Sequence, residues 1–265
     1  MQAWLHHPYF VAAIAPFIVA LLTAELFLRL RLSGLALIAG FAITVFLVAN
    51  FDLHPLTLTQ QIIYTALAAS VLGVLFSLID WPWLNALLPL AGVVLAVCML
   101  WPLVQQHAPL KMLILLASSA GFVGLLVWGM DNLIDAPLRA ANAATALGLS
   151  TGIAVWSSTT LYGEFAISMG CAAVAHLLIQ MISKQALAAE RGFTLPASLV
   201  IGIITCVAFV AGHLPWYCLP LMAAIPLLAW VMPLPKMAAL LQSLLLSLMT
   251  VPLAVGVVYL ARHPL

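Results

Sequence analysis

A histidine and a glutamine stand one helical turn apart in an otherwise apolar run, CAAVAHLLIQMIS, as His176 and Gln180. Residues four apart share one face of a helix, so both side chains would point the same way. Imidazole changes charge near neutral pH, and an ionisable group inside an apolar helix needs a partner or water. Two hypotheses stay open: the pair relays protons or binds substrate, or a neutral histidine is hydrogen-bonded to a neighbouring helix.

The segment that precedes this run is rich in small and polar residues, and residues 140–163 read AANAATALGLSTGIAVWSSTTLYG. Small side chains allow helices to pack closely, and hydroxyl groups can bond across a helix pair. The same features suit the wall of a binding cavity with an aromatic face. An interior packing helix and a cavity wall both fit the pattern. The candidate binding residues on this segment are Asn142, Trp156, Ser157 and Ser158.

Glu164 is the acidic residue that the sequence explains least, because no basic residue lies near it along the chain. It is either solvated or a cation or proton site that faces a cavity. The sequence contains no nucleophile elbow, zinc-protease motif, phosphate loop or dinucleotide fingerprint. The four cysteines lack the spacing of a metal site. We therefore assign no catalytic residue, no metal and no cofactor.

Several charged residues are spaced to pair on helices. Glu25 lies four residues before Arg29, and Asp135 lies four residues before Arg139, with Asp131 a further turn back. An acid four residues ahead of a base is the favourable order on a helix. We expect ion pairs at the ends of the helices, which either satisfy these charges or form a gate.

The composition indicates which elements must position these residues. Hydrophobic residues make up 66% of the 265 residues, charged residues only 6%, and the mean hydropathy is +1.24. These values are typical of an integral membrane protein, with the lipid bilayer as its main partner. Long unbroken apolar runs exclude the alternating pattern of a membrane β-barrel, so we predict an all-α bundle. A net charge of +1 leaves no basic surface for nucleic acid.

Breaks at proline, glycine and charged residues divide the chain into about ten segments of the length that crosses a bilayer. Their connections are short, so we expect a single membrane domain without a soluble domain. The predicted spans are 8–28, 33–50, 58–79, 84–104, 110–130, 138–160, 164–183, 194–213, 216–233 and 237–261.

The basic residues predict the orientation of these spans. Most of them fall in the odd-numbered connections, and by the positive-inside rule both termini then face away from the cytoplasm. We expect the chain in the inner (plasma) membrane of a bacterium. The odd connections hold Arg29, Arg31, Arg139, Lys184, Arg191 and Lys236, and the other positions hold Lys111 and Arg262.

The chain also repeats a phrase, Lys-Met-x-x-Leu-Leu-x-Ser, at Lys111–Ser118 and again at Lys236–Ser243. Upstream of each copy, in the same order, lie a Pro-Trp step and two Pro-Leu steps thirteen residues apart. We interpret this pattern as an internal duplication with halves 1–134 and 135–265. Each half would contain five spans, and an odd number places the second half upside down. The expected architecture is a five-plus-five inverted repeat.

Ten short-looped spans in two halves are similar in architecture to the drug/metabolite transporter superfamily and to the bile-acid and sodium/proton antiporter folds. This resemblance covers the whole chain, rests on architecture alone and identifies no family. The predicted termini also depart from the usual cytoplasmic termini of drug/metabolite transporters. No residue role is therefore carried over from these families.

The leading hypothesis is a secondary transporter, or permease, of a small organic solute that works by alternating access and is coupled to protons through His176 or Glu164. It predicts a midplane cavity between the halves, lined by spans four, six, seven and nine. A second hypothesis is a non-catalytic subunit that scaffolds or regulates a larger complex, with partner membrane subunits or as a homo-oligomer. A third is a membrane enzyme acting on a lipid-linked substrate, whose acids would have to cluster at one membrane face.

Overall fold

The computed structural model describes residues 7–28, 34–49, 57–78, 83–182, 190–233 and 238–263. These residues form helices and turns without a strand, which confirms the all-α prediction. The elements are η1 (Phe10–Ile14), α2 (Ala15–Leu28), α3 (Gly34–Ala49), α4 (Leu58–Ser77), α5 (Leu84–Val104), α6 (Pro109–Asp131), α7 (Pro137–Val155), α8 (Thr160–Ile182), α9 (Glu190–Val210), α10 (Cys218–Val231) and α11 (Ala239–Arg262).

Six of these helices, α4, α5, α6, α8, α9 and α11, are long and apolar enough to cross a membrane. They support the class of integral membrane protein, whereas η1 with α2, α3 and α10 form shorter apolar segments. The predicted spans agree with most helix bounds to within a few residues. The largest difference lies between α7 and α8, where α7 ends at Val155 and α8 already begins at Thr160. The count of ten spans stays a prediction.

Contacts between helix termini define two ends of the bundle. At one end, Arg139 at the start of α7 bonds the end of α10, and Arg191 at the start of α9 bonds the ends of α4 and α6. At the other end, Tyr9 next to η1 stacks on Trp156, which follows α7. We call these the arginine end and the tryptophan end. Consecutive helices run between them in opposite directions.

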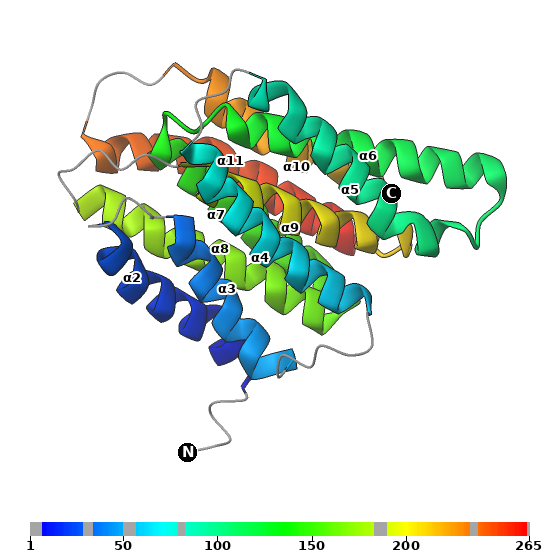
Figure 1. The fold of residues 1–265 in the computed structure, drawn as a ribbon, viewed down its shortest axis with the longest axis horizontal. Helices are drawn as coiled ribbons and strands as arrows, with labels where there is room; N and C mark the ends of the chain where they lie inside the picture. Colours follow the sequence, from blue (N-terminus) through cyan, green and yellow to red (C-terminus); the bar gives the residue numbers. More distant parts are fainter. Residues whose placement is uncertain are drawn as a thin grey trace.

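Helix α9 lies at the centre of the bundle and is buried along its whole length. A helix that is apolar on all sides is stable only when other helices surround it. In Figure 1, α2 and α3 lie on one flank of the bundle, and α5 and α6 lie on the other. Helix α4, which the proposed duplication equates with α9, keeps an exposed face. In the described residues these two equivalent helices therefore pack differently.

Glycines hold α7 against α8 at backbone distance. A β-carbon at Gly148 would lie only 2.6 Å from the Cα atom of Gly170, and one at Gly163 would lie 2.9 Å from the Cα atom of Trp156. Residues without a side chain allow this approach, as at other close helix contacts in membranes. The small residues of 140–163 thus serve close helix packing in α7.

A second close contact fixes the start of α9 at the arginine end. A β-carbon at Gly73 of α4 would lie 2.5 Å from the carbonyl oxygen of Arg191, and the backbones at Gly34 of α3 and Gly192 also touch. The first turn of α9 is therefore wedged between α3 and α4. This contact sets the positions of the side chains that follow on α9.

Candidate functional site

His176 and Gln180 lie on one face of α8 and are both buried, with 1% and 7% of their surface exposed. The His176 ring stacks on the ring of Phe193 in α9, with 4.7 Å between centroids and 24° between planes. Both ring nitrogens of His176 and both polar atoms of the Gln180 amide are without a hydrogen-bond partner among the described residues. Buried polar atoms in proteins nearly always have such a partner. This pair is the candidate functional site.

The pair lies closer to the arginine end of α8 than to its tryptophan end. We expected His176 near the middle of its span, but α8 begins at Thr160 and ends at Ile182. At 1.5 Å per residue, His176 is roughly 24 Å along the helix from its start and roughly 9 Å from its end. The predicted span 164–183 begins four residues later than α8 does, which moves its midpoint toward His176.

Arg191 forms an ionic network on another side of α9. Its Nε atom donates to Oδ1 of Asp131 over 3.2 Å, and its two terminal nitrogens donate to the carbonyl oxygen of Phe76 and to Oδ1 of Asn85. Residues two apart on a helix point about 200° away from each other. Arg191 therefore faces α4, α5 and α6, whereas Phe193 faces α8 and His176.

Among the residues that the structure describes, the predicted ion pair of Asp135 with Arg139 is not formed. Arg139 donates from its Nη1 atom to the carbonyl oxygens of Ala229 and Trp230, at 3.0 and 3.1 Å, and Asp135 is exposed. A cation at the carboxyl end of α10 satisfies carbonyl groups that have no partner inside that helix. Asp131 pairs with Arg191 rather than with a residue of its own segment. The remaining predicted pair, Glu25 with Arg29, lies outside the side chains that the structure describes.

Glu164 is buried to 9% exposure in the second turn of α8, near the tryptophan end. Within the described part of the chain it makes no hydrogen bond or ion pair. Twelve residues separate it from His176, which corresponds to roughly 18 Å along the helix. Glu164 and His176 therefore do not belong to one site. Asp131 and Asp135 lie at the arginine end, whereas Glu164 lies near the tryptophan end. These three acids therefore do not gather at one membrane face, although the enzyme hypothesis requires that they do.

Three residues predicted to line a cavity instead lie where α7 ends. The Trp156 ring stacks on Tyr9 with 6.2 Å between centroids and 8° between planes. The Ser158 hydroxyl donates to the carbonyl oxygen of Val155 over 2.8 Å. Ser157 is exposed. The contacts of Trp156 and Ser158 thus lie at the tryptophan end of the bundle.

Asn142 joins α7 to α11. Its Nδ2 atom donates to the hydroxyl of Ser247 over 2.8 Å, and its Oδ1 atom accepts from the hydroxyl of Thr250 over 2.9 Å. The same residues line an open groove of about 300 Å³ between the two helices, together with Thr145 and Ser150. Asn142 is thus both a packing residue and part of a groove wall.

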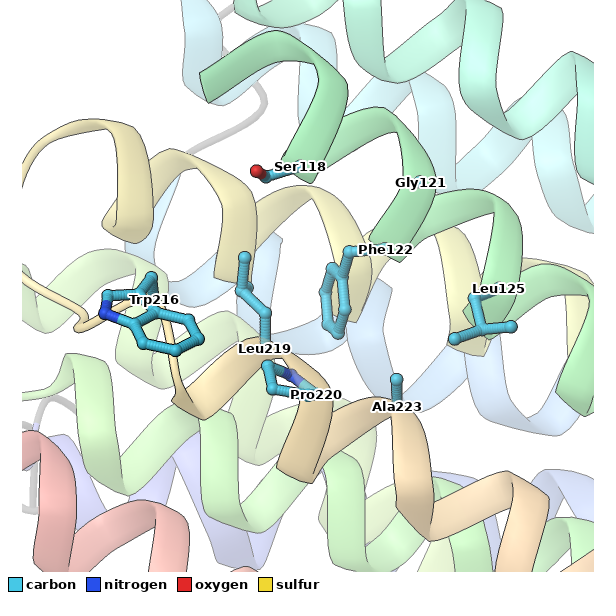
Figure 2. Close-up of a pocket in the computed structure, with 8 residues that line it drawn as sticks. All are labelled: Ser118, Gly121, Phe122, Leu125, Trp216, Leu219, Pro220 and Ala223. Carbon is cyan, nitrogen blue, oxygen red and sulfur yellow. The ribbon is translucent and has the colours of Figure 1, made fainter. Parts of the chain in front are cut away.

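A second groove lies between α6 and α10 and has a volume of about 250 Å³. Figure 2 shows Phe122 reaching from α6 toward α10, and Leu219 reaching from α10 toward α6. Neither of the two grooves contains His176 or Glu164, and neither has the lining predicted for a central cavity.

Sequence reasoning found the polar pair but missed Phe193, which lies against it, and Asn85, which bonds Arg191 on another side of α9. Phe193 and Asn85 carried no signal, because their roles depend on how separate helices pack. Arg191 was noted only as a basic residue of a connection. No three His, Cys, Asp or Glu side chains among the described residues lie close enough together to hold a metal ion. No model of a known protein family matches this chain, and no match to a curated protein was found.

Proposed function

We propose that this chain is a multi-pass membrane transporter, a permease for a small organic solute, with His176 and Gln180 as the polar groups of its internal site. The observation that carries the proposal is the set of four buried hydrogen-bonding atoms on these two side chains, none of which is bonded within the described residues. Leaving such atoms unpaired costs about 1–3 kcal/mol for each group. In this proposal, a solute that passes through the bundle supplies the missing hydrogen-bond partners.

The chemistry of the pair indicates the kind of solute. Imidazole donates from one nitrogen and accepts at the other, and the amide of Gln180 also supplies a donor and an acceptor. The Phe193 ring lies against His176 and adds an apolar surface. A neutral organic solute with a few hydrogen-bonding groups matches this combination, and a strongly charged one does not. Proton coupling is proposed through His176 or Glu164, since both side chains can gain and lose a proton.

The expected architecture provides a mechanism for transport. In the proposed five-plus-five inverted repeat, two packings of the same halves open the site to opposite sides in turn. His176 lies nearer the arginine end. We therefore propose that the described packing is closer to the state in which the site opens toward the arginine end. The positive-inside rule makes the arginine end cytoplasmic and both termini non-cytoplasmic, in the plasma membrane of a bacterium.

Flux measurements on the purified chain test this proposal. The protein would be reconstituted into vesicles that contain a pH-sensitive dye, and a panel of small neutral organic solutes would be added under a pH gradient. We expect at least one solute to drive proton movement, and His176→Phe to slow it by about tenfold or more, as the loss of the imidazole's hydrogen bonds to the solute and of its proton site predicts. His213→Phe is the matched control, because His213 is exposed in the turn after α9.

The subunit hypothesis predicts a different result from the same preparation. It expects no flux with any solute and stable co-purification with partner membrane proteins. Equal flux from the wild type and from His176→Phe would also contradict the proposed site, even if the chain transports a solute.

A further inference from the structure

The groove between α6 and α10 has the shape of a wedge that opens toward the tryptophan end. Near the arginine end the helices touch, since a β-carbon at Gly129 would lie 3.2 Å from the ring of Pro226. Two turns earlier on α6, a β-carbon at Gly121 would meet no atom within 4 Å. The wedge closes beside the edge-to-face pair of Trp128 and Trp230, whose ring centroids are 5.4 Å apart.

The walls of this groove are almost entirely apolar. Figure 2 shows Phe122 and Leu219 between the two helices, with Leu125 and Ala223 toward the closed end. Ser118 contributes the hydroxyl group on the α6 wall. Such a lining suits a hydrocarbon chain and gives no set of polar contacts that would hold a polar solute.

Polar and charged groups instead lie at the open end. Trp216 lies at this end of the groove and is 69% exposed, which is the typical position of tryptophan at the level of lipid headgroups. Lys111 is exposed and lies seven residues before Ser118, so both are on one face of α6, roughly 10 Å apart along the helix. The repeated Lys-Met-x-x-Leu-Leu-x-Ser phrase thus places a cation directly above the groove.

A second cation lies on the far side of α10. The thiol of Cys218 at the start of α10 contacts the carbonyl oxygen of Val257 in α11, and Arg262 lies roughly 8 Å further along α11. Of the four lysines and arginines in the described residues, Lys111 and Arg262 are the two at the tryptophan end. Both flank the helix that forms one wall of the groove.

We propose that this groove binds one acyl chain of an anionic glycerophospholipid from the leaflet at the tryptophan end. The chain lies between Trp216 and the Gly129–Pro226 contact, and the phosphate lies beside Lys111. Burial of methylene groups supplies the affinity for the chain, and the cation supplies the preference for an anionic headgroup. The site is separate from His176 and does not depend on transport.

Lipid binding to the detergent-solubilised, full-length protein tests the proposal. Native mass spectrometry would follow titrations with phosphatidylglycerol and, in parallel, phosphatidylcholine. Gly121→Leu adds a side chain where a β-carbon would meet no atom within 4 Å and so occupies part of the groove, and we expect it to weaken phosphatidylglycerol binding by about tenfold, the loss for two excluded methylene groups. Gly256→Leu is the matched control, because a β-carbon at Gly256 on α11 also meets no atom within 4 Å.

Lys111→Gln tests the headgroup separately, at a position where folding is not at risk. We expect it to abolish the preference for phosphatidylglycerol over phosphatidylcholine while the chain still binds. Equal binding by Gly121→Leu and Gly256→Leu would overturn the proposal, as would equal binding of both lipids to the wild type. A wild-type dimer in light scattering that Gly121→Leu dissociates would also overturn it, because a second copy would then occupy the groove.

Discussion

Asn142 and His176 are buried polar residues on the neighbouring helices α7 and α8, and they differ in their hydrogen bonds. The Asn142 amide bonds Ser247 and Thr250 of α11. His176 and Gln180 bond nothing in the part of the chain that the structure describes. A paired buried group stabilises the fold by about 1 kcal/mol per bond, whereas an unpaired one destabilises it.

This difference separates two uses of polar residues in an apolar bundle. The fold explains Asn142, because the amide holds α11 against α7. The fold does not explain His176 and Gln180, since phenylalanine and leucine at these positions would pack without the cost of unpaired polar atoms. Buried residues that cost stability are candidates for function.

The largest loss of stability is expected where α7 and α8 touch, because this contact positions Asn142 on α7 and the pair of His176 and Gln180 on α8. Gly148→Leu would push a side chain into the backbone of Gly170, where the Cβ atom alone already lies 2.6 Å from Cα. The backbone cannot move aside as a side chain can. We therefore expect the free energy of unfolding to fall by about 3 kcal/mol or more and little protein to be folded. Size-exclusion chromatography of the detergent-solubilised protein measures this loss, with Gly256→Leu as the control that should fold normally.

A smaller loss is expected for the ionic network of α9. Asp131→Asn removes the charge opposite Arg191 but leaves the bonds to Phe76 and Asn85. We expect about 2 kcal/mol of destabilisation, the usual value for a hydrogen bond to a charged group. Thermal unfolding of this variant against Asp135→Asn, which changes an exposed acid, gives the comparison. Equal melting temperatures would mean that the network adds nothing to stability.

The next smaller loss of stability is expected at Asn142, which is hydrogen-bonded to α11. Asn142→Leu breaks two hydrogen bonds between α7 and α11, and we expect it to lower the free energy of unfolding by about 1–2 kcal/mol. Thr145→Val is the control on the same helix, because the Thr145 hydroxyl is buried without a partner among the described residues. We expect this control to be neutral or slightly stabilising. A larger loss of stability for Thr145→Val than for Asn142→Leu would contradict the stabilising role of the Asn142 hydrogen bonds.

The smallest effect on stability is expected for the buried pair of His176 and Gln180. Gln180→Leu removes two buried polar atoms that bond nothing in the described residues, so the melting temperature should stay the same or rise. Thermal unfolding in the same detergent measures it. A clear drop would show that Gln180 has a stabilising partner and would weaken the case for a site.

The helices themselves could be predicted from the sequence because long apolar runs leave few alternatives in a membrane. The span predicted at 84–104 is helix α5, Leu84–Val104. The span predicted at 138–160 ends earlier, at Val155, and Trp156, whose N–H still bonds the carbonyl oxygen of Gly152, stacks on Tyr9. A stacking contact between residues so far apart leaves no local pattern.

The site could be predicted only in part. The four-residue spacing of His176 and Gln180 correctly places both on one face of α8. The ring of Phe193 against His176 could not be predicted, because only the packing of α9 brings it there. The same spacing rule failed for the charges: it favoured pairs within one segment, whereas Asp131 pairs with Arg191, sixty residues away.

The most direct test of the account measures unfolding and proton flux side by side in His176→Phe and Asn142→Leu. His176→Phe keeps a ring against Phe193, so we expect a free energy of unfolding within about 1 kcal/mol of the wild type, with flux lost. Asn142→Leu should lose stability and keep flux at temperatures where it is folded. The opposite pattern, in which His176→Phe transports normally and unfolds more easily, would show that His176 is a structural residue and would contradict the account.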